Sequence, residues 1–264
     1  MLIIGEKINS SIPSVAAAIK NKDKSFIQKL AQDQVNAGAG IIDVNAGAFI
    51  GEEEELLCWL VNIVQDVIDV PLCIDSPNPE ALAAALPLAK KKPVINSISA
   101  EEDRYISIIP LLKKYPSAVI ALCMDDKGIP ATVEQRIRIA QSLTSRLMAD
   151  GMKVEDIYLD VMVQPIGTDG QSGFVALETV RAIKELIPGV HTTCGLSNVS
   201  FGLPKRKLLN QAFAVALAAY GMDTMFIDPL DEKMMALLCA TDTLTGCDDF
   251  CCQYLTSFRA GKLV

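Results

Sequence analysis

Short apolar runs of strand length recur along the whole chain, and amphipathic stretches of helix length separate them. Several of these runs are continuously apolar, as is typical of parallel strands that helices cover on both faces. The predicted strands are residues 2–8, 41–46, 71–76, 93–98, 118–124, 157–163, 191–197 and 222–228. This alternation predicts an α/β fold built from repeated strand–helix units.

The segments between the predicted strands contain helix start and stop signals. Gly38 follows an amphipathic stretch and fits a C-terminal stop, and Pro79 fits a first helical turn. Ser99 has the spacing of a capping box with the glutamate three residues later. Residues 132–150 and 205–219 have the periodicity of long amphipathic helices.

The length and the uniform composition limit the number of domains. The chain has 264 residues, half of them apolar, and a closed barrel of eight strand–helix units needs about 250. No linker, repeat or low-complexity tract divides the chain. We therefore predict one (β/α)₈ TIM barrel as a single domain over residues 1–264. An open doubly wound sheet is the alternative.

The charge pattern excludes some classes of partner. The net charge is −8, and basic runs such as Lys205–Lys207 are no longer than three residues, so we expect no nucleic acid partner. No apolar stretch approaches the ~20 residues that a membrane-spanning helix needs, and the first residues do not resemble an export signal. We therefore expect a cytoplasmic protein that does not bind membranes.

The eight cysteines mostly lie inside apolar runs, and we expect them to be reduced and buried. Cys247, Cys251 and Cys252 are the most closely spaced group. Their spacing contains no C-x-x-C pair, and no histidine lies nearby. This pattern favours helix packing over a metal site for the three thiols.

The predicted strands tend to end on polar residues. These residues are Glu6, Asn9, Asp43, Asn45, Asp75, Ser76, Asn96, Asp160, Asn198 and Asp228. Any one of them can cap a helix or shape a turn, but in a barrel all of these strand ends face one cavity. Carboxylates and amides dominate the set and basic residues are scarce. Such a cavity suits a planar, nitrogen-rich heterocycle better than a phosphate group.

Histidine occurs once, at His191, where the seventh strand begins. This position is at the barrel end opposite the predicted cavity, so we interpret His191 as structural. Catalysis by a Ser-His-Asp or Cys-His arrangement is therefore excluded. Asp43, Asp75 and Asp160 could still bind Mg²⁺, which leaves a metal-dependent lyase or aldolase as an alternative.

The strand ends, taken in order, resemble those of the pterin-binding methyltransferases. The matching segments are LIIGEKIN (2–9), IIDVNAGA (41–48), LCIDS (72–76), INS (95–97), YLDV (158–161) and GLSNVSFGLPKR (195–206). The likeness is to methyltetrahydrofolate:corrinoid protein methyltransferases and to the folate domain of cobalamin-dependent methionine synthase. It implies a TIM barrel, usually a homodimer, that binds its pterin at the C-terminal ends of the strands.

The resemblance also implies which residues contact the pterin. Asp75, Asn96 and Asp160 would hydrogen-bond the pyrimidine edge and ring nitrogens of the pterin. Asn9 and Asn45 are lesser candidates for pterin binding.

The resemblance implies roles for two residues near the seventh strand and for the substrates. Asn198 would be the catalytic group near N5, in addition to binding the pterin, and Arg206 would border the folate. Tetrahydrofolate and 5-methyltetrahydrofolate would be substrates, cobalamin would be carried by a corrinoid protein that docks transiently, and no metal would bind directly to the chain.

Dihydropteroate synthase shares the expected fold and pterin chemistry, and it is the nearest alternative. That family is expected to have a basic motif near the last strand, whereas the last strand here runs into the acidic sequence IDPLDEK. A pterin-binding subunit without catalytic activity is a further alternative.

Overall fold

The computed structural model describes residues 1–264 and contains one sheet of eight parallel strands. The strands are β1 (Leu2–Asn9), β2 (Ile41–Asn45), β3 (Leu72–Asp75), β4 (Val94–Ser99), β5 (Ala118–Leu122), β6 (Ile157–Asp160), β7 (His191–Thr193) and β8 (Thr224–Ile227). The sheet order is β7-β6-β5-β4-β3-β2-β1-β8, so consecutive strands pair with each other from β1 up to β7, and β1 also pairs with β8.

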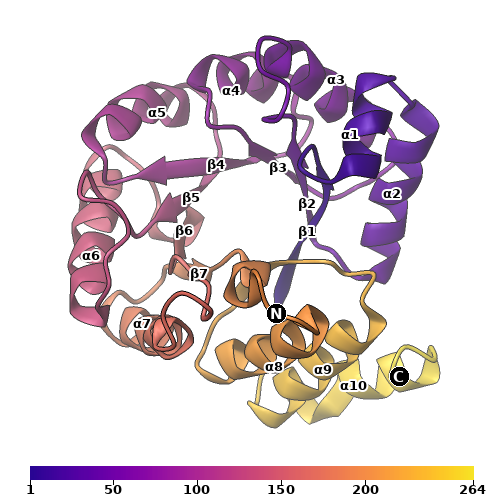
Figure 1. Cartoon of the computed structure of the whole chain (residues 1–264), viewed down its shortest axis with the longest axis vertical. Helices are drawn as coiled ribbons and strands as arrows, with labels where there is room; N and C mark the ends of the chain where they lie inside the picture. The colour runs from indigo at the N-terminus through magenta and orange to yellow at the C-terminus, as the bar shows by residue number, and fades with distance from the viewer.

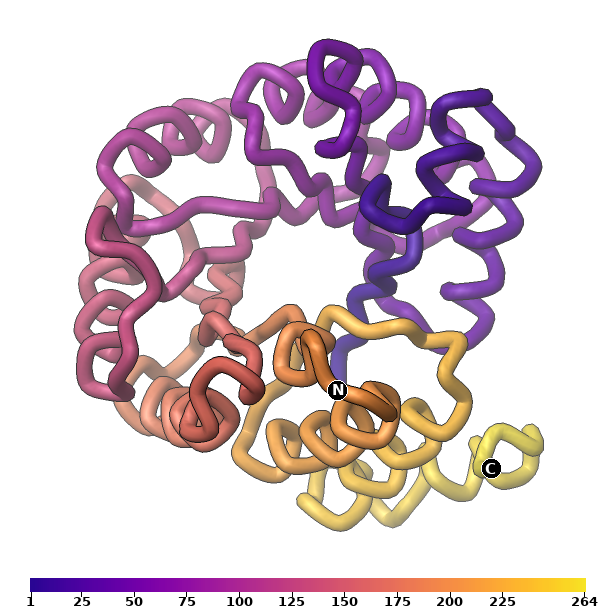
Figure 2. The backbone as a smooth tube through the Cα atoms, viewed as in Figure 1, coloured from indigo at the N-terminus to yellow at the C-terminus, as the bar shows by residue number.

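The sheet closes on itself. β1 and β8 pair in parallel from Leu2↔Thr224 to Gly5↔Ile227, and Figure 2 shows the first strand running beside the segment that contains β8. The remaining gap between β7 and β8 is joined by a hydrogen bond from the backbone NH of Phe226 to the carbonyl of Cys194, at 3.1 Å. The predicted (β/α)₈ barrel is therefore confirmed, and the sheet is not an open one.

The helices form an outer ring around the strands (Figure 1). They are α1 (Pro13–Lys20), α2 (Lys24–Ala37), α3 (Glu53–Gln65), α4 (Pro79–Ala85), α5 (Glu102–Lys114), α6 (Val133–Ala149), α7 (Ser172–Leu186), α8 (Arg206–Ala219), α9 (Glu232–Leu244) and α10 (Cys252–Arg259). Short 3₁₀ turns lie at η1 (Leu86–Leu88), η2 (Val154–Asp156), η3 (Leu196–Ser200) and η4 (Asp249–Cys251). None of the helices is long and apolar enough to span a membrane.

Local sequence signals explain several helix ends. Gly38 ends α2 with a left-handed φ of 116°, and Pro79 begins α4. The capping box predicted at Ser99 is wrong, because Ser99 is the last residue of β4 and its hydroxyl instead donates to Glu101 at 2.8 Å. A complete capping box is present at the start of α6, where Thr132 and Gln135 bond each other's backbone.

Side chains inside the barrel are arranged in two layers. The lower layer is apolar and contains Ile4, Ile41, Cys73, Val94, Ala118, Ile120 and Phe226. Because side chains on one face of a strand recur every two residues, a polar layer follows, in which Glu6, Asp43, Asp75 and Asn96 come after Ile4, Ile41, Cys73 and Val94, and Asp160 comes after Tyr158, which packs against the apolar cluster. The apolar layer closes the bottom of the barrel, and the polar layer above it forms the floor of an open end.

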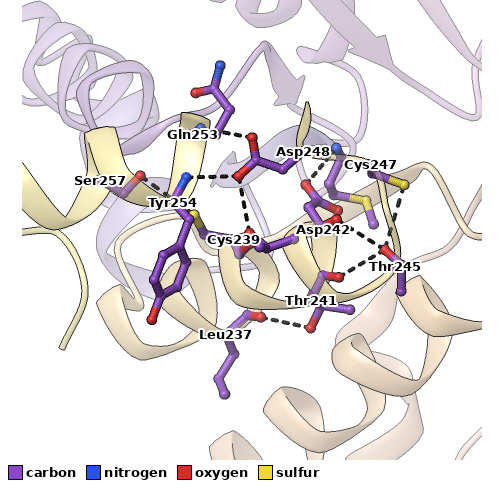
Figure 3. A network of polar contacts seen from close by, with 12 residues as sticks. Leu237, Cys239, Thr241, Asp242, Thr245, Cys247, Asp248, Gln253, Tyr254 and Ser257 are labelled. Carbon is purple, nitrogen blue, oxygen red and sulfur yellow. Dashed lines mark hydrogen bonds and ion pairs between the residues drawn. The ribbon is translucent and has the colours of Figure 1, made fainter. Parts of the chain in front are cut away.

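The chain beyond α9 packs outside the barrel. Asp248 holds the turn into α10 by accepting hydrogen bonds from the backbone NH groups of Gln253 and Tyr254, at 2.9 and 3.0 Å (Figure 3). Here the prediction that the cysteines are buried is wrong, because Cys247, Cys251 and Cys252 are exposed. The buried Cys73, Cys123 and Cys194 lie in or directly after barrel strands, whereas these three lie around η4, outside the barrel.

Candidate pterin-binding site

A cavity of about 550 Å³ lies at the C-terminal ends of the strands. Its lining is Glu6, Lys7, Asn9, Ser11, Ile12, Asp43, Asp75, Asn96, Asp160, Gly195, Ser197, Asn198, Arg206, Phe226 and Asp228. Six of the seven residues predicted from the sequence to contact the ligand belong to this lining, and Asn45 is the exception. The barrel therefore brings together side chains from strands that are far apart in the sequence.

Asn45 lies beside Asp75 on the neighbouring strand and does not line the cavity. Its side-chain NH₂ donates to Asp75 Oδ2 at 2.9 Å, and its carbonyl oxygen accepts from Ser10 Oγ at 2.8 Å and from the NH of Gly47 at 3.0 Å. With all of these contacts made inside the chain, Asn45 can orient the Asp75 carboxylate toward a ligand.

Asp75 lies between two amide side chains on the neighbouring strands. In the sheet register, Asp75 is paired with Asn45 on one side and Asn96 on the other. Burial raises the pKa of Asp75 to about 6, although the hydrogen bond from Asn45 and the charge of Arg104 act to lower it. Asp75 can therefore ionise near neutral pH, as acceptance of hydrogen bonds from a ligand requires.

Asp43 lies beneath Asp75 and is 2% exposed. Burial raises the pKa of Asp43 well above its ordinary value, and the nearby charge of Asp75 raises it further. One oxygen of its carboxyl group has no hydrogen-bond partner in the chain. We conclude that Asp43 is the carboxyl of this pair that holds a proton, while Asp75 ionises.

Asp160 ends β6 and is fixed by the turn that follows it. Its Oδ1 accepts a hydrogen bond from the NH of Met162 at 2.7 Å, and Met162 has a left-handed φ of 58°. Burial raises the pKa of Asp160 to about 6, and the bond from Met162 and the charge of Arg136 oppose this rise. Arg136 is itself buried and donates to the carbonyl of Val161 at 2.6 Å, which ties α6 to the cavity floor.

Asn198 reaches the cavity from η3. The sequence predicted a strand from 191 to 197, but β7 ends at Thr193 and the chain turns at Gly195 into η3. A Cβ atom at Gly195 would lie 3.2 Å from Asn198 Nδ2, so glycine at this position allows the amide to pack closely over the backbone. This turn places Asn198 at the edge of the cavity instead of in the sheet.

Arg206 begins α8 and braces the same turn. Its guanidinium donates to the carbonyl of Ser197 at 2.7 Å and to Ser200 Oγ at 3.1 Å. Arg206 is exposed and lines the cavity rim. It is therefore placed both to hold η3 and to approach an outer part of a bound ligand.

Four charged residues that were not predicted as ligand contacts also line the cavity: Glu6, Lys7, Asp43 and Asp228. Three of them were visible as polar residues at strand ends. Lys7 gave no such signal, because strict alternation would turn either Glu6 or Lys7 away from the barrel interior. The pairing of β1 with β2 shifts register between Gly5 and Ile8, and this irregularity lets both side chains line the cavity.

His191 lies at the other end of the barrel, as its position in the sequence suggested. Its ring stacks on Tyr158 with centroids 4.6 Å apart, and its Nδ1 lies 3.1 Å from Asp223 Oδ2. Burial alone would raise the pKa of Asp223, but hydrogen bonds from His191, Lys184 and the NH of Thr192 lower it to about 2. These contacts join β6, β7 and the start of β8, which supports a structural role.

The family model described as pterin binding enzyme matches residues 5–228, which include every strand end of the cavity. The chain belongs to this family. Among curated proteins, it is 40% identical to methylcorrinoid:tetrahydrofolate methyltransferase of Eubacterium limosum over 265 residues, which covers 100% of this chain and 98% of that protein. It is also 28% identical to methionine synthase of Mycobacterium leprae over 86% of this chain, but the match spans only 20% of that protein.

Solved structures of pterin-binding enzymes share the fold. A dihydropteroate synthase from Yersinia pestis superposes with a TM-score of 0.70 at 18% identity, covering 93% of this chain and 94% of that one. One from Clostridium difficile reaches a TM-score of 0.73 at 21% identity, covering 92% and 96%. At these identities, the likeness establishes the barrel architecture alone.

Proposed function

We propose that this pterin-binding enzyme moves a methyl group between N5 of tetrahydrofolate and the cobalt of a corrinoid held by a separate protein. The observation that carries the proposal is the 40% identity, over the full length of both chains, to a protein named for that reaction. The cavity supports it independently, because its amides and carboxylates match the donors and acceptors of a pterin.

Asp75, Asn96 and Asp160 bind the pyrimidine edge of the pterin in this proposal. The two carboxylates accept hydrogen bonds from ring and amino N–H groups, and the amide of Asn96 can both donate and accept. All three side chains line the cavity at the C-terminal ends of their strands, which supports this role. Asn9 and Arg206 border the part of the folate nearer the rim, and Asn45 acts through Asp75.

Asn198 acts at N5. A methyl group on a tertiary amine leaves poorly, because the departing nitrogen would carry a negative charge. The Asn198 amide lowers this barrier if it donates a stronger hydrogen bond to N5 as charge develops there. Removing a single donor of this type from an active site costs about 3–4 kcal/mol in the transition state.

The corrinoid is a substrate that its own carrier protein delivers to the open end of the barrel. The contact has to be transient, because the cobalt must also exchange its methyl group with another partner. From the family resemblance, we also propose that the enzyme is a homodimer and works in the cytoplasm.

Dihydropteroate synthesis is less well supported. Such an enzyme must hold a diphosphate leaving group, for which basic groups at the end of β8 would be suitable. Here β8 is followed by Asp228 and Asp231, which pair with Lys7 at 2.9 Å and cap α9, respectively. A Mg²⁺-dependent lyase has less support, because no group of three or more His, Cys, Asp or Glu side chains is arranged to hold a metal ion.

Two substitutions test the residue roles together with the reaction. Methyl transfer from 5-methyltetrahydrofolate to cob(I)alamin is followed anaerobically, and folate binding is measured separately. Asn198→Ala should lower kcat by about 100-fold or more with little change in the folate Kd, whereas Asp75→Asn should mainly raise the Kd. Asn36→Ala, on the exposed side of α2, is the matched control. Normal turnover and binding in both variants would overturn the assignment.

A further inference from the structure

A second cavity, of about 300 Å³, adjoins the first. It lies between the η3–α8 corner and the β8–α9 connection, and its own lining is Leu196, Lys207, Asn210, Ile227, Asp231 and Met234. The two cavities share Glu6, Ser197, Arg206 and Asp228. These four residues therefore lie at the boundary between the two cavities.

Two of the shared residues are carboxylic acids, and they differ in how firmly they are held. Asp228 pairs with Lys7 at 2.9 Å and accepts a hydrogen bond from the NH of Leu230 at 3.0 Å. These bonds hold the Asp228 carboxylate in place. No hydrogen bond contributes to the pKa of Glu6. That pKa is set by burial and by the charges of neighbouring residues.

The pKa of Glu6 lies near neutrality. Burial raises it to about 7, with a further rise from the charge of Asp228, while the charges of Lys7 and Arg206 act to lower it. On the other strands, Asp43 and Cys194 also experience the charge of Glu6. A carboxyl with this pKa can both give and take a proton at neutral pH, as a general acid or base must.

The proposed reaction needs a proton to be moved. When the methyl group leaves N5, the electron pair of the broken N–C bond stays on nitrogen and takes up a proton, while cobalt(I) supplies the electron pair of the new Co–C bond. In the opposite direction, N5 forms its bond to the methyl group and loses its proton, and the Co–C electron pair returns to cobalt. The amide of Asn198 can hydrogen-bond N5, but it is not an acid that can supply this proton.

We propose that Glu6 carries this proton between N5 and the solvent by way of the second cavity, an inference that rests on the proposed methyl transfer. The corrinoid protein has to cover the open end of the barrel during transfer, so the proton needs a lateral route. Asp75 and Asp160 are less suited to the task, because one is tied to Asn45 and the other to the NH of Met162, at 2.9 and 2.7 Å. Glu6 is the shared carboxyl that remains free to exchange.

The pH dependence of single-turnover rates in both directions tests this role. In the wild-type enzyme, the rate of transfer from 5-methyltetrahydrofolate to cob(I)alamin should fall as the pH rises through about 7, because protonated Glu6 is needed. The rate from methylcobalamin to tetrahydrofolate should instead rise through that region. Glu6→Gln should slow both directions by about 100-fold and remove this pH dependence, while the folate Kd changes by less than about threefold, a difference below 1 kcal/mol.

Asp228→Asn is a second variant that distinguishes a proton carrier from a structural residue. It removes a negative charge that raises the pKa of Glu6 and frees Lys7, whose charge lowers it. The midpoint of both pH profiles should therefore move below 7. Glu155→Gln makes the same change of charge at an exposed position that precedes β6, and it should leave the midpoint in place.

The outcomes separate the two proposals. If wild-type enzyme transfers methyl groups but Glu6→Gln keeps the wild-type profile, or Asp228→Asn does not move the midpoint, the role of Glu6 is wrong and the proposed function stands. If wild-type enzyme transfers no methyl group to or from cobalamin or its corrinoid protein, the proposed function fails and the role of Glu6 fails with it.

Discussion

Replacing Asn45 with alanine tests whether this residue acts through Asp75. The substitution removes three hydrogen bonds, one to Asp75, one from Ser10 and one from the NH of Gly47, with lengths of 2.8–3.0 Å. Each such bond contributes about 1 kcal/mol net to folding. We therefore expect the free energy of unfolding to fall by about 3 kcal/mol.

The same substitution should change the ligand affinity. The hydrogen bond from Asn45 is the largest influence that lowers the pKa of Asp75, so Asn45→Ala raises that pKa above about 6. At pH 7, a larger fraction of Asp75 is then protonated and cannot accept hydrogen bonds from the pterin. The folate Kd should rise, and it should recover as the pH is increased toward 8.

Urea unfolding and calorimetric folate titrations at pH 6, 7 and 8 measure both effects. A double-mutant cycle with Asp75→Ala shows whether they share a cause, because coupled residues give non-additive changes. Losses of affinity that add independently, or an unfolding free energy within roughly 0.5 kcal/mol of wild type, the scatter of a neutral surface change, would show that Asn45 does not act through Asp75.

Three further predictions concern single positions. Gly195→Ala puts a Cβ 3.2 Å from Asn198 Nδ2, so displacement of the amide should lower kcat by about 10- to 100-fold with near-normal folate binding, and an unchanged kcat would contradict this placement. The pKa of Asp223 is lowered to about 2, so Asp223 contributes stability that is present above about pH 4 and is lost as the pH falls from about 4 to 2. Asp223→Asn should lower the free energy of unfolding at pH 7 by about 2 kcal/mol. Urea unfolding of this variant should also show a smaller loss of stability between about pH 4 and 2. The raised pKa of Glu6 makes the folded state lose stability as the pH rises from about 4.5 to 7. In urea unfolding, Glu6→Gln should reduce this decline most clearly between about pH 6 and 7, above the pKa values of about 6 of Asp75 and Asp160, and an unchanged decline there would contradict it.

Hydrophobic patterning was sufficient to predict the barrel. Parallel strands that are covered on both faces leave a strong signal, and the predicted ranges overlap all eight strands. The same patterning located most of the cavity. Asp75, Asn96 and Asp160 each lie two residues after an inward-facing residue of the layer below, so they point into the same barrel interior. Local signals were less dependable. No capping box forms at Ser99, and the one that does form, at Thr132, was not predicted.

Features that depend on three-dimensional contacts could not be predicted. The register shift in β1 brings both Glu6 and Lys7 to the cavity, and strand alternation alone does not contain that information. Asn45 has the sequence position of a ligand contact, but its side chain bonds Ser10 and Asp75 and does not line the cavity. Cys251 lies within a run that looks apolar, yet no sheet covers that part of the chain.

The central claim is that the cavity brings a folate methyl group to cobalt. Its most direct test is an anaerobic mixture of the purified protein, 5-methyltetrahydrofolate and cob(I)alamin, with a metal chelator present, in which the cobalt(I) absorption is followed. Cobalt(I) should be converted to methylcobalamin at a rate proportional to protein concentration and unaffected by chelator. Failure to bind folate, or folate binding with no methyl transfer to either free cobalamin or a corrinoid protein, would contradict it.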